Sequence, residues 1–166
     1  MIARALKQPD DYFAEFFKDP LLTLSLIQYS LEQSNPEDGV QGCGSHTDYG
    51  CLTLLLTNEV PGLEIKRNDK WIAVPPIYPG GFIVNIGDML ERWSNGRFKS
   101  TVHRVTTGKS GKLRLSAPFF FEPNYDAVVQ SLPGTGDSKF EPITCGEYLR
   151  MKFEQAFDRK EEKPKP

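Results

Sequence analysis

Two side chains that can do acid–base or metal chemistry stand two residues apart in the stretch His46-Thr47-Asp48. In an extended segment, residues i and i+2 share a face, so the imidazole and the carboxylate would project the same way. The apolar run at 51–57 follows at once and predicts a buried strand headed by this pair. Because an unpaired buried carboxylate is costly, the pair needs a partner.

The chain has only two histidines, and the second one, His103, lies within a strand predicted at 101–105. A lone histidine in a strand is usually a core or surface residue with an ordinary hydrogen bond. Two imidazoles and one carboxylate on adjacent strands, in contrast, form the facial triad that holds non-haem Fe(II) and leaves coordination positions open. A His-x-Asp pair alone is weak evidence for a metal site, so the residues around the pair must support that interpretation.

The elements that would position these residues are mostly short strands separated by turn formers. A strand is predicted at each of 21–29, 51–57, 63–66, 71–74, 82–86, 101–105 and 113–121. Helices are predicted at 9–17, from the spacing of its phenylalanines, and at 143–157, where Thr144 and Glu147 have capping-box spacing. This pattern predicts a mainly β sandwich or jelly roll with flanking helices. A doubly wound α/β sheet would need helices in gaps that are too short.

Composition excludes several classes of function. The chain has 166 residues, 25% of them charged, and a net charge of −2, with no basic stripe for a nucleic acid. It contains neither an apolar run of membrane-spanning length nor the apolar core of a signal peptide. Its three cysteines form no CxxC motif, which favours reduced thiols. We therefore expect a cytoplasmic protein with a small-molecule substrate and neither a nucleic-acid nor a membrane partner.

The residues around the histidines resemble a known family. The segments "HTDYGCLTLLLTNEVPGLEI", "GGFIVNIGDMLERWSNGRFKSTVHRV" and "KLRLSAPFFFEP" are similar to the iron- and 2-oxoglutarate-dependent oxygenases of the isopenicillin-N-synthase-like group. The likeness runs from about residue 20 to residue 125. That family's pattern is His-x-Asp, a second histidine some fifty residues later, and Arg-x-Ser on the next strand. The resemblance implies a double-stranded β-helix, which is a distorted jelly roll.

The resemblance also implies a cofactor, a cosubstrate and a reaction. Fe(II) would be bound by His46, Asp48 and His103, and dioxygen and 2-oxoglutarate would take the open positions. Arg114, assisted by Ser116 and Tyr29, would bind the far carboxylate of 2-oxoglutarate with its guanidinium fork. Hydroxylation or desaturation of a small molecule would then accompany release of succinate and carbon dioxide, with ascorbate as a candidate reductant. Strand alternation adds Phe120 and Glu122 as candidates for the substrate pocket.

Family members are typically about twice this length, which leads us to expect a truncated or shortened relative. The corresponding divisions are a remnant of an N-terminal helical region at 1–20, the oxygenase core at 21–125, a loop and helix at 126–157, and a charged tail at 158–166. We expect part of the core's outer surface to be uncovered and the chain to self-associate or to be marginally stable.

Two other functions stay open at this point. The chain could be a related non-haem iron oxidase that does not use 2-oxoglutarate, because such relatives retain the Arg-x-Ser pair. It could also be an inactive jelly-roll module that binds a small acid or a metal. A zinc hydrolase is disfavoured, since the sequence has no HExxH-type helix. The prime substrate and the oligomeric state are open.

Overall fold

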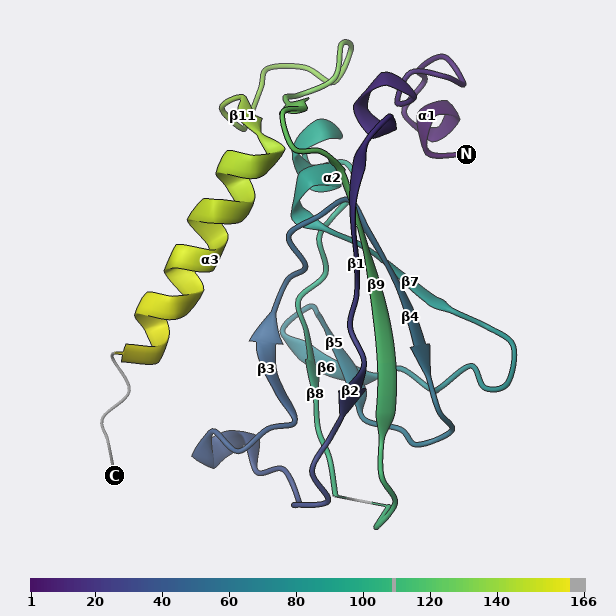
Figure 1. The fold of residues 1–166 in the computed structure, drawn as a ribbon, viewed down its shortest axis with the longest axis vertical. Helices are drawn as coiled ribbons and strands as arrows, with labels where there is room; N and C mark the ends of the chain where they lie inside the picture. Colours follow the sequence, from purple (N-terminus) through teal and green to yellow (C-terminus); the bar gives the residue numbers. More distant parts are fainter. Residues whose placement is uncertain (109, 162–166) are drawn as a thin grey trace.

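The fold consists of two main antiparallel sheets and a small two-stranded sheet, with helices at one end and along one side (Figure 1). A computed structural model describes the backbone of residues 1–108 and 110–161 and the side chains of 1–108 and 110–156. The larger sheet has the order β1-β9-β4-β7, with β2 also pairing with β9. Its strands are β1 (Pro20–Leu24), β2 (Ile27–Gln28), β4 (Leu52–Thr57), β7 (Ile83–Ile86) and β9 (Leu115–Asn124).

The smaller sheet has the order β3-β8-β5-β6. Its strands are β3 (Cys43–His46), β5 (Leu63–Arg67), β6 (Lys70–Ala73) and β8 (His103–Val105). Side chains of both sheets line one internal cavity, so the sheets face each other. The mainly β jelly roll predicted from the sequence is confirmed. The predicted strand at 21–29 is two strands, because Ser25 and Leu26 interrupt it between β1 and β2.

The remaining elements are short, apart from one long helix. They are α1 (Ile2–Ala5), η1 (Glu15–Phe17), η2 (Pro36–Asp38), α2 (Asp88–Trp93), β10 (Val128–Val129), β11 (Ile143–Thr144) and α3 (Cys145–Glu161). α1 and α2 lie at one end of the larger sheet, and α3 runs down one side of the molecule next to β3 (Figure 1). No helix of the described residues is long and apolar enough to cross a membrane.

The helix predicted at 9–17 is wrong. This segment forms turns followed by the single 3₁₀ turn η1. The rings of Phe13, Phe16 and Phe17 lie 5.4, 5.3 and 6.2 Å from the ring of Trp93, which is only 1% exposed. A segment this short has little helical stability of its own, so packing around Trp93 decides its conformation.

The helix α3 begins with the predicted capping box. The Thr144 N–H donates to Oε2 of Glu147 at 3.1 Å, and the Glu147 N–H donates to Oγ1 of Thr144 at 3.2 Å. These reciprocal bonds satisfy two donors at the start of the helix. α3 continues to Glu161, four residues into the predicted charged tail, and residues 162–166 lie outside the described residues.

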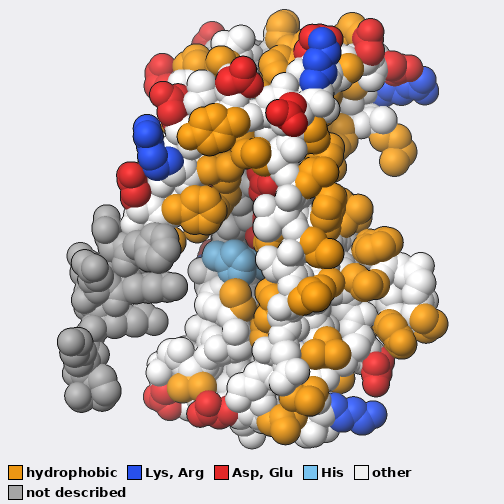
Figure 2. Space-filling view, viewed as in Figure 1, with side chains coloured by type: hydrophobic (Ala, Val, Ile, Leu, Met, Phe, Trp, Pro, Cys, Tyr) orange, Lys and Arg blue, Asp and Glu red, His pale blue; other side chains and the backbone are white. Residues whose placement is uncertain are grey.

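The outer face of the larger sheet is apolar across all four of its main strands. The register places Leu24, Phe119, Leu54 and Val84 in one cross-strand row, and Leu22, Phe121, Leu52 and Ile86 in a parallel row. Leu24 and Val84 are 61% and 57% exposed. Figure 2 shows this apolar surface as a continuous band along the sheet. An antiparallel sheet with one solvated face normally has polar residues there, so this face differs from an ordinary solvent-facing surface.

Candidate active site

The two histidines face each other on adjacent strands of the smaller sheet. His46 is the last residue of β3 and His103 is the first residue of β8, and the register pairs the two directly. Their ring centroids are 4.3 Å apart. The sequence led us to expect His46 and Asp48 at the start of the strand that follows them, and this expectation is wrong. His46 ends β3, and Asp48 lies between β3 and β4. β3 belongs to the smaller sheet and β4 to the larger one, so Asp48 lies where the chain crosses between the sheets.

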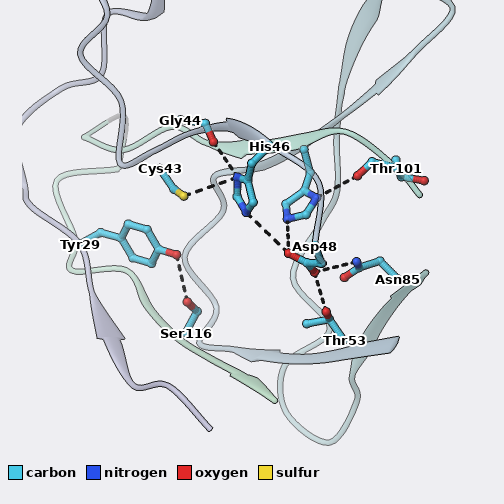
Figure 3. A network of polar contacts seen from close by, with 10 residues as sticks. Tyr29, Cys43, Gly44, His46, Asp48, Thr53, Asn85, Thr101 and Ser116 are labelled. Carbon is cyan, nitrogen blue, oxygen red and sulfur yellow. Dashed lines mark hydrogen bonds and ion pairs between the residues drawn. The ribbon is translucent and has the colours of Figure 1, made fainter. Parts of the chain in front are cut away.

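One ligand atom from each of His46, Asp48 and His103 lies within 4.8 Å of the other two. Figure 3 shows His46 and Asp48 pointing toward each other. Oδ1 of Asp48 lies 3.7 Å from Nε2 of His46 and 3.5 Å from Nε2 of His103. Ligand atoms that each bind one ion at about 2.1 Å are separated by roughly 3–4 Å. Two imidazole nitrogens and one carboxylate oxygen at this spacing therefore fit a single divalent transition metal with open coordination positions.

Hydrogen bonds orient both imidazole rings toward the candidate metal position. Nδ1 of His46 donates to the carbonyl oxygen of Gly44 at 2.7 Å, and Nδ1 of His103 donates to that of Thr101 at 2.9 Å. With the proton on Nδ1, each neutral ring directs the lone pair of Nε2 at the common point. The tautomer that a metal site requires is thus fixed by the backbone two residues before each histidine.

The carboxylate of Asp48 is held by two donors that sequence reasoning missed. Oδ2 accepts hydrogen bonds from Oγ1 of Thr53 at 2.5 Å and from Nδ2 of Asn85 at 2.8 Å, which leaves Oδ1 facing the histidines. Backbone groups fix the same loop, because the Asp88 N–H at the start of α2 donates to the Asp48 carbonyl oxygen at 2.8 Å. Inward alternation along β4 and β7 was the available sequence signal for Thr53 and Asn85.

The pKa of His46 reflects competing influences. Burial lowers the pKa of His46. The Cys43 thiol, the Gly44 carbonyl and the Asp48 carboxylate together raise it by more, so the pKa lies at about 9 rather than the ordinary 6.5. Sγ of Cys43 lies 3.8 Å from Nδ1 of the histidine. In the metal-free protein this raised pKa favours a second proton, on Nε2 of His46, and a metal ion must displace that second proton to bind.

A cavity between the two sheets adjoins the triad. Its volume is about 110 Å³, and most of its wall is apolar. The apolar side chains on it include Ile27, Leu55, Leu63, Ile65, Ile83 and Phe120. The polar lining groups include the triad with Thr53 and Asn85, Arg114 just before β9, and Ser116 within β9. A mostly apolar wall with a few convergent polar groups is typical of a ligand site.

Arg114 is the most unusual residue in this cavity. It is 3% exposed, and its Nε and Nη1 have no hydrogen-bond partner among the described residues. No described carboxylate forms an ion pair with it. Its guanidinium carbon lies 4.6 Å from the centre of the Tyr29 ring. A buried cation without an anionic partner is very costly, so the geometry fits an anionic ligand in the cavity.

The structure brings together the other predicted cosubstrate residues. The hydroxyl groups of Tyr29 and Ser116 lie 3.1 Å apart, and both residues are buried. Burial alternates from Leu113 to Ser116, which puts Arg114 and Ser116 on one inward face as predicted. Phe120 lies on the cavity wall.

Glu122 is the one predicted site residue that the structure does not bring into the cavity. It is buried, but it lies outside the cavity lining and packs beside Gly50. Burial, and then the nearby Asp48 carboxylate, raise the pKa of Glu122 to about 7.

Comparison with known proteins places this fold and site in one family. The 2OG-Fe(II) oxygenase superfamily matches residues 20–123. The 2-oxoglutarate-Fe(II) type oxidoreductase hxnY of Emericella nidulans is 35% identical over 97% of this chain and 48% of its own length. The homoarginine-6-hydroxylase 2-ODD-233 of Oryza sativa subsp. japonica is 40% identical over 91% of this chain and 48% of its own.

The solved structures agree with the sequence relatives. A full-length Neurospora crassa protein solved in complex with alpha-KG superposes with a TM-score of 0.84 and 33% identity, over 93% of this chain and 50% of that one. The chain belongs to the 2OG-Fe(II) oxygenase superfamily, and it spans about half the length of the relatives that it matches.

Proposed function

We propose that this chain carries the catalytic core of an oxygenase that uses Fe(II) and 2-oxoglutarate to hydroxylate or desaturate a small molecule, with release of succinate and carbon dioxide. One observation carries the proposal. The same cavity holds a convergent His-Asp-His triad and a buried arginine whose Nε and Nη1 have no hydrogen-bond partner among the described residues. A metal-binding group and an anion-binding group in one small cavity match the two ends of 2-oxoglutarate, which are its 2-oxo acid group and its far carboxylate.

His46, Asp48 and His103 would hold the iron, and Thr53 and Asn85 would orient the carboxylate ligand. Iron bound there supplies the redox chemistry that couples dioxygen to the oxidation of both substrates. Three protein ligands leave open positions for the 2-oxo acid group and for dioxygen.

The remaining residues would bind and orient 2-oxoglutarate. The planar guanidinium of Arg114 matches the far carboxylate with two parallel hydrogen bonds. Ser116 can donate a further hydrogen bond. Tyr29 contacts Ser116 through its hydroxyl group and Arg114 through the face of its ring. The apolar walls exclude water from the reacting groups. Ascorbate, as a reductant, and a cytoplasmic location belong to the same proposal.

The relatives support a small-molecule prime substrate. The same Neurospora crassa protein has been solved with alpha-KG together with thymine and with 5-formyluracil. We extend the general class to this chain and name no individual substrate. Of the two alternative functions, an oxidase that does not use 2-oxoglutarate is disfavoured by the alpha-KG complex of this structural relative.

The test is a titration of the Fe(II)-loaded chain with 2-oxoglutarate in the absence of oxygen, followed by the metal-to-ligand charge-transfer absorption. We expect a saturable band in the wild type. Arg114→Ala should weaken 2-oxoglutarate binding by about 30-fold or more, since it removes a bidentate ion pair from a buried site. Arg114→Lys should recover little of this loss, because an ammonium cannot reproduce the fork.

The matched control is Arg97→Ala, which removes an exposed arginine that donates to the carbonyl oxygen of Gly134. It should titrate like the wild type. If the wild type gives no band, or if Arg114→Ala titrates normally, 2-oxoglutarate is not the cosubstrate. A band without succinate release under oxygen, across panels of small acids, terpenoids and phenolics, would favour the inactive binding module.

A further inference from the structure

Gly62 leaves room for the side chain of Arg114. It lies just before β5, and its backbone has φ = +151°, a value that side-chain-bearing residues rarely adopt. A methyl group at the Cβ position of residue 62 would lie 3.1 Å from Cδ and 3.3 Å from Nε of Arg114. These distances are shorter than ordinary van der Waals contacts between heavy atoms. The arginine stem therefore passes directly over the missing side chain.

The backbone around Gly62 leaves little freedom to absorb such a methyl group. The same Cβ position is 2.4 Å from the carbonyl oxygen of Thr106. Gly62 and Thr106 are also tied together, because the Thr106 N–H donates to the Gly62 carbonyl oxygen at 2.9 Å. A substitution must displace this backbone pair, the arginine stem, or both.

A second glycine occupies the corresponding position against Tyr29, the other half of the arginine–tyrosine stack. A Cβ atom at Gly42 would lie 3.0 Å from Cδ1 of the Tyr29 ring and 2.6 Å from the methyl carbon of Thr107. That methyl group cannot rotate away freely, because Oγ1 of Thr107 donates to the carbonyl oxygen of Glu32 at 2.9 Å. Any side chain at Gly42 therefore presses on the tyrosine ring.

We propose that Gly62 and Gly42 are positioning residues for the 2-oxo acid: they set where the Arg114–Tyr29 stack lies in the cavity, and hence the preference for a dicarboxylate over a monocarboxylate. This inference rests on the proposed function, since it takes Arg114 as the group that binds the far carboxylate. It assigns selectivity to two residues with no side chain, neither of which needs to touch the cosubstrate.

The experiment compares 2-oxoglutarate with 2-oxobutyrate, which keeps the 2-oxo acid group and lacks the far carboxylate. Both are titrated without oxygen into the Fe(II)-loaded chain. Gly62→Ala should weaken 2-oxoglutarate binding by about tenfold or more, because sub-ångström displacement of a binding group has effects of this size. Binding of 2-oxobutyrate and of Mn(II) should change less than about twofold. A general loss of structure would lower all three affinities.

A double-mutant cycle shows whether Gly62 acts through Arg114. In the Arg114→Ala background, Gly62→Ala should have no further effect on 2-oxoglutarate binding. The matched control is Gly136→Ala, since Gly136 also has a positive φ, +91°, but has nothing within 4 Å of its Cβ position. It should leave the ratio of the two affinities unchanged.

Gly42→Ala provides a second variant without a positive φ, in case Gly62→Ala does not fold. It should reduce the preference for 2-oxoglutarate in the same direction. The inference is overturned if both acids lose affinity equally, if the losses at Gly62 and Arg114 simply add, or if Gly42→Ala keeps the wild-type preference. If the wild type itself binds no 2-oxoglutarate, the proposed function fails instead.

Discussion

Thr53 and Asn85 are direct cross-strand partners on β4 and β7, and both donate to the same oxygen of Asp48. The larger sheet thereby orients a carboxylate whose two candidate co-ligands come from the smaller sheet. The geometry of the candidate metal site therefore depends on the packing of the two sheets against each other.

Removing one of these donors should weaken metal binding without removing a ligand. Thr53→Val keeps the shape of the side chain and should lower Mn(II) affinity by about 10- to 100-fold, as is usual for groups that orient metal ligands. Thr57→Val is the matched control, because Thr57 is buried on the same face of β4 and has no hydrogen bond to Asp48. Equal Mn(II) affinities for the two variants, measured by calorimetry, would contradict this role.

Metal binding should stabilise the folded chain. A metal at 100 times its Kd adds about 2.7 kcal/mol to the free energy of unfolding, so Mn(II) should raise the Tm and EDTA should reverse the change. His103→Ala removes one of the three candidate ligands and should abolish most of this shift. One metal per chain is expected by elemental analysis, and undiminished metal content in the variant would show that His103 is not a ligand.

Glu122 should make the metal-free chain less stable as the pH rises. Burial raises the pKa of its carboxyl group from the ordinary 4.5 to about 7, so the folded state binds its proton more tightly than the unfolded state does. Its contribution to stability is fully present below pH 4.5 and is lost as the pH rises to about 7. The loss is roughly 3 kcal/mol, since each pKa unit is worth about 1.4 kcal/mol.

Glu122→Gln removes this titration while keeping the size of the side chain. The variant should match the wild type near pH 4 and unfold at higher urea concentration near pH 8, both with EDTA present. A constant difference between the two proteins across this range would mean that Glu122 titrates normally.

The apolar outer face of the larger sheet should cause the chain to self-associate. Exposed apolar surfaces of this extent are typical of interaction sites. Leu24→Lys and Val84→Lys each place a charge in the cross-strand row that contains Phe119 and Leu54, and they should shift the sedimentation profile toward monomer. Asp69→Lys, at an exposed turn, controls for added charge. A monodisperse wild-type monomer would rule out the effect.

The sequence predicted those parts of the site that depend on local spacing. Alternation along β9 places Arg114, Ser116 and Phe120 on one face, and the capping box at Thr144 marks the start of α3. The resemblance to the family also implied that His46 and His103 would meet at one metal site.

Features set by long-range packing were not predictable in this way. The role of Thr53 depends on its register with Asn85, which no local pattern encodes. The 9–17 segment has helical spacing, but it packs around Trp93 and does not form a helix. The helix α2 was not predicted, because its six residues are too few to give a clear helical pattern. Glu122 alternates correctly with Phe120, yet it lies beyond the end of the cavity, because alternation gives the face of a strand and not the position along it.

The position of β9 between β1 and β4 has a consequence for folding. Both neighbours are made early in the chain, yet each pairs with residues 115–124. During synthesis, the larger sheet cannot assemble until this late strand has left the ribosome. Structures dominated by such distant pairings fold slowly, in about milliseconds to seconds. Until then β1 has no partner strand and β4 pairs only with β7, so the apolar strand edges that β9 will cover stay unpaired in the nascent chain.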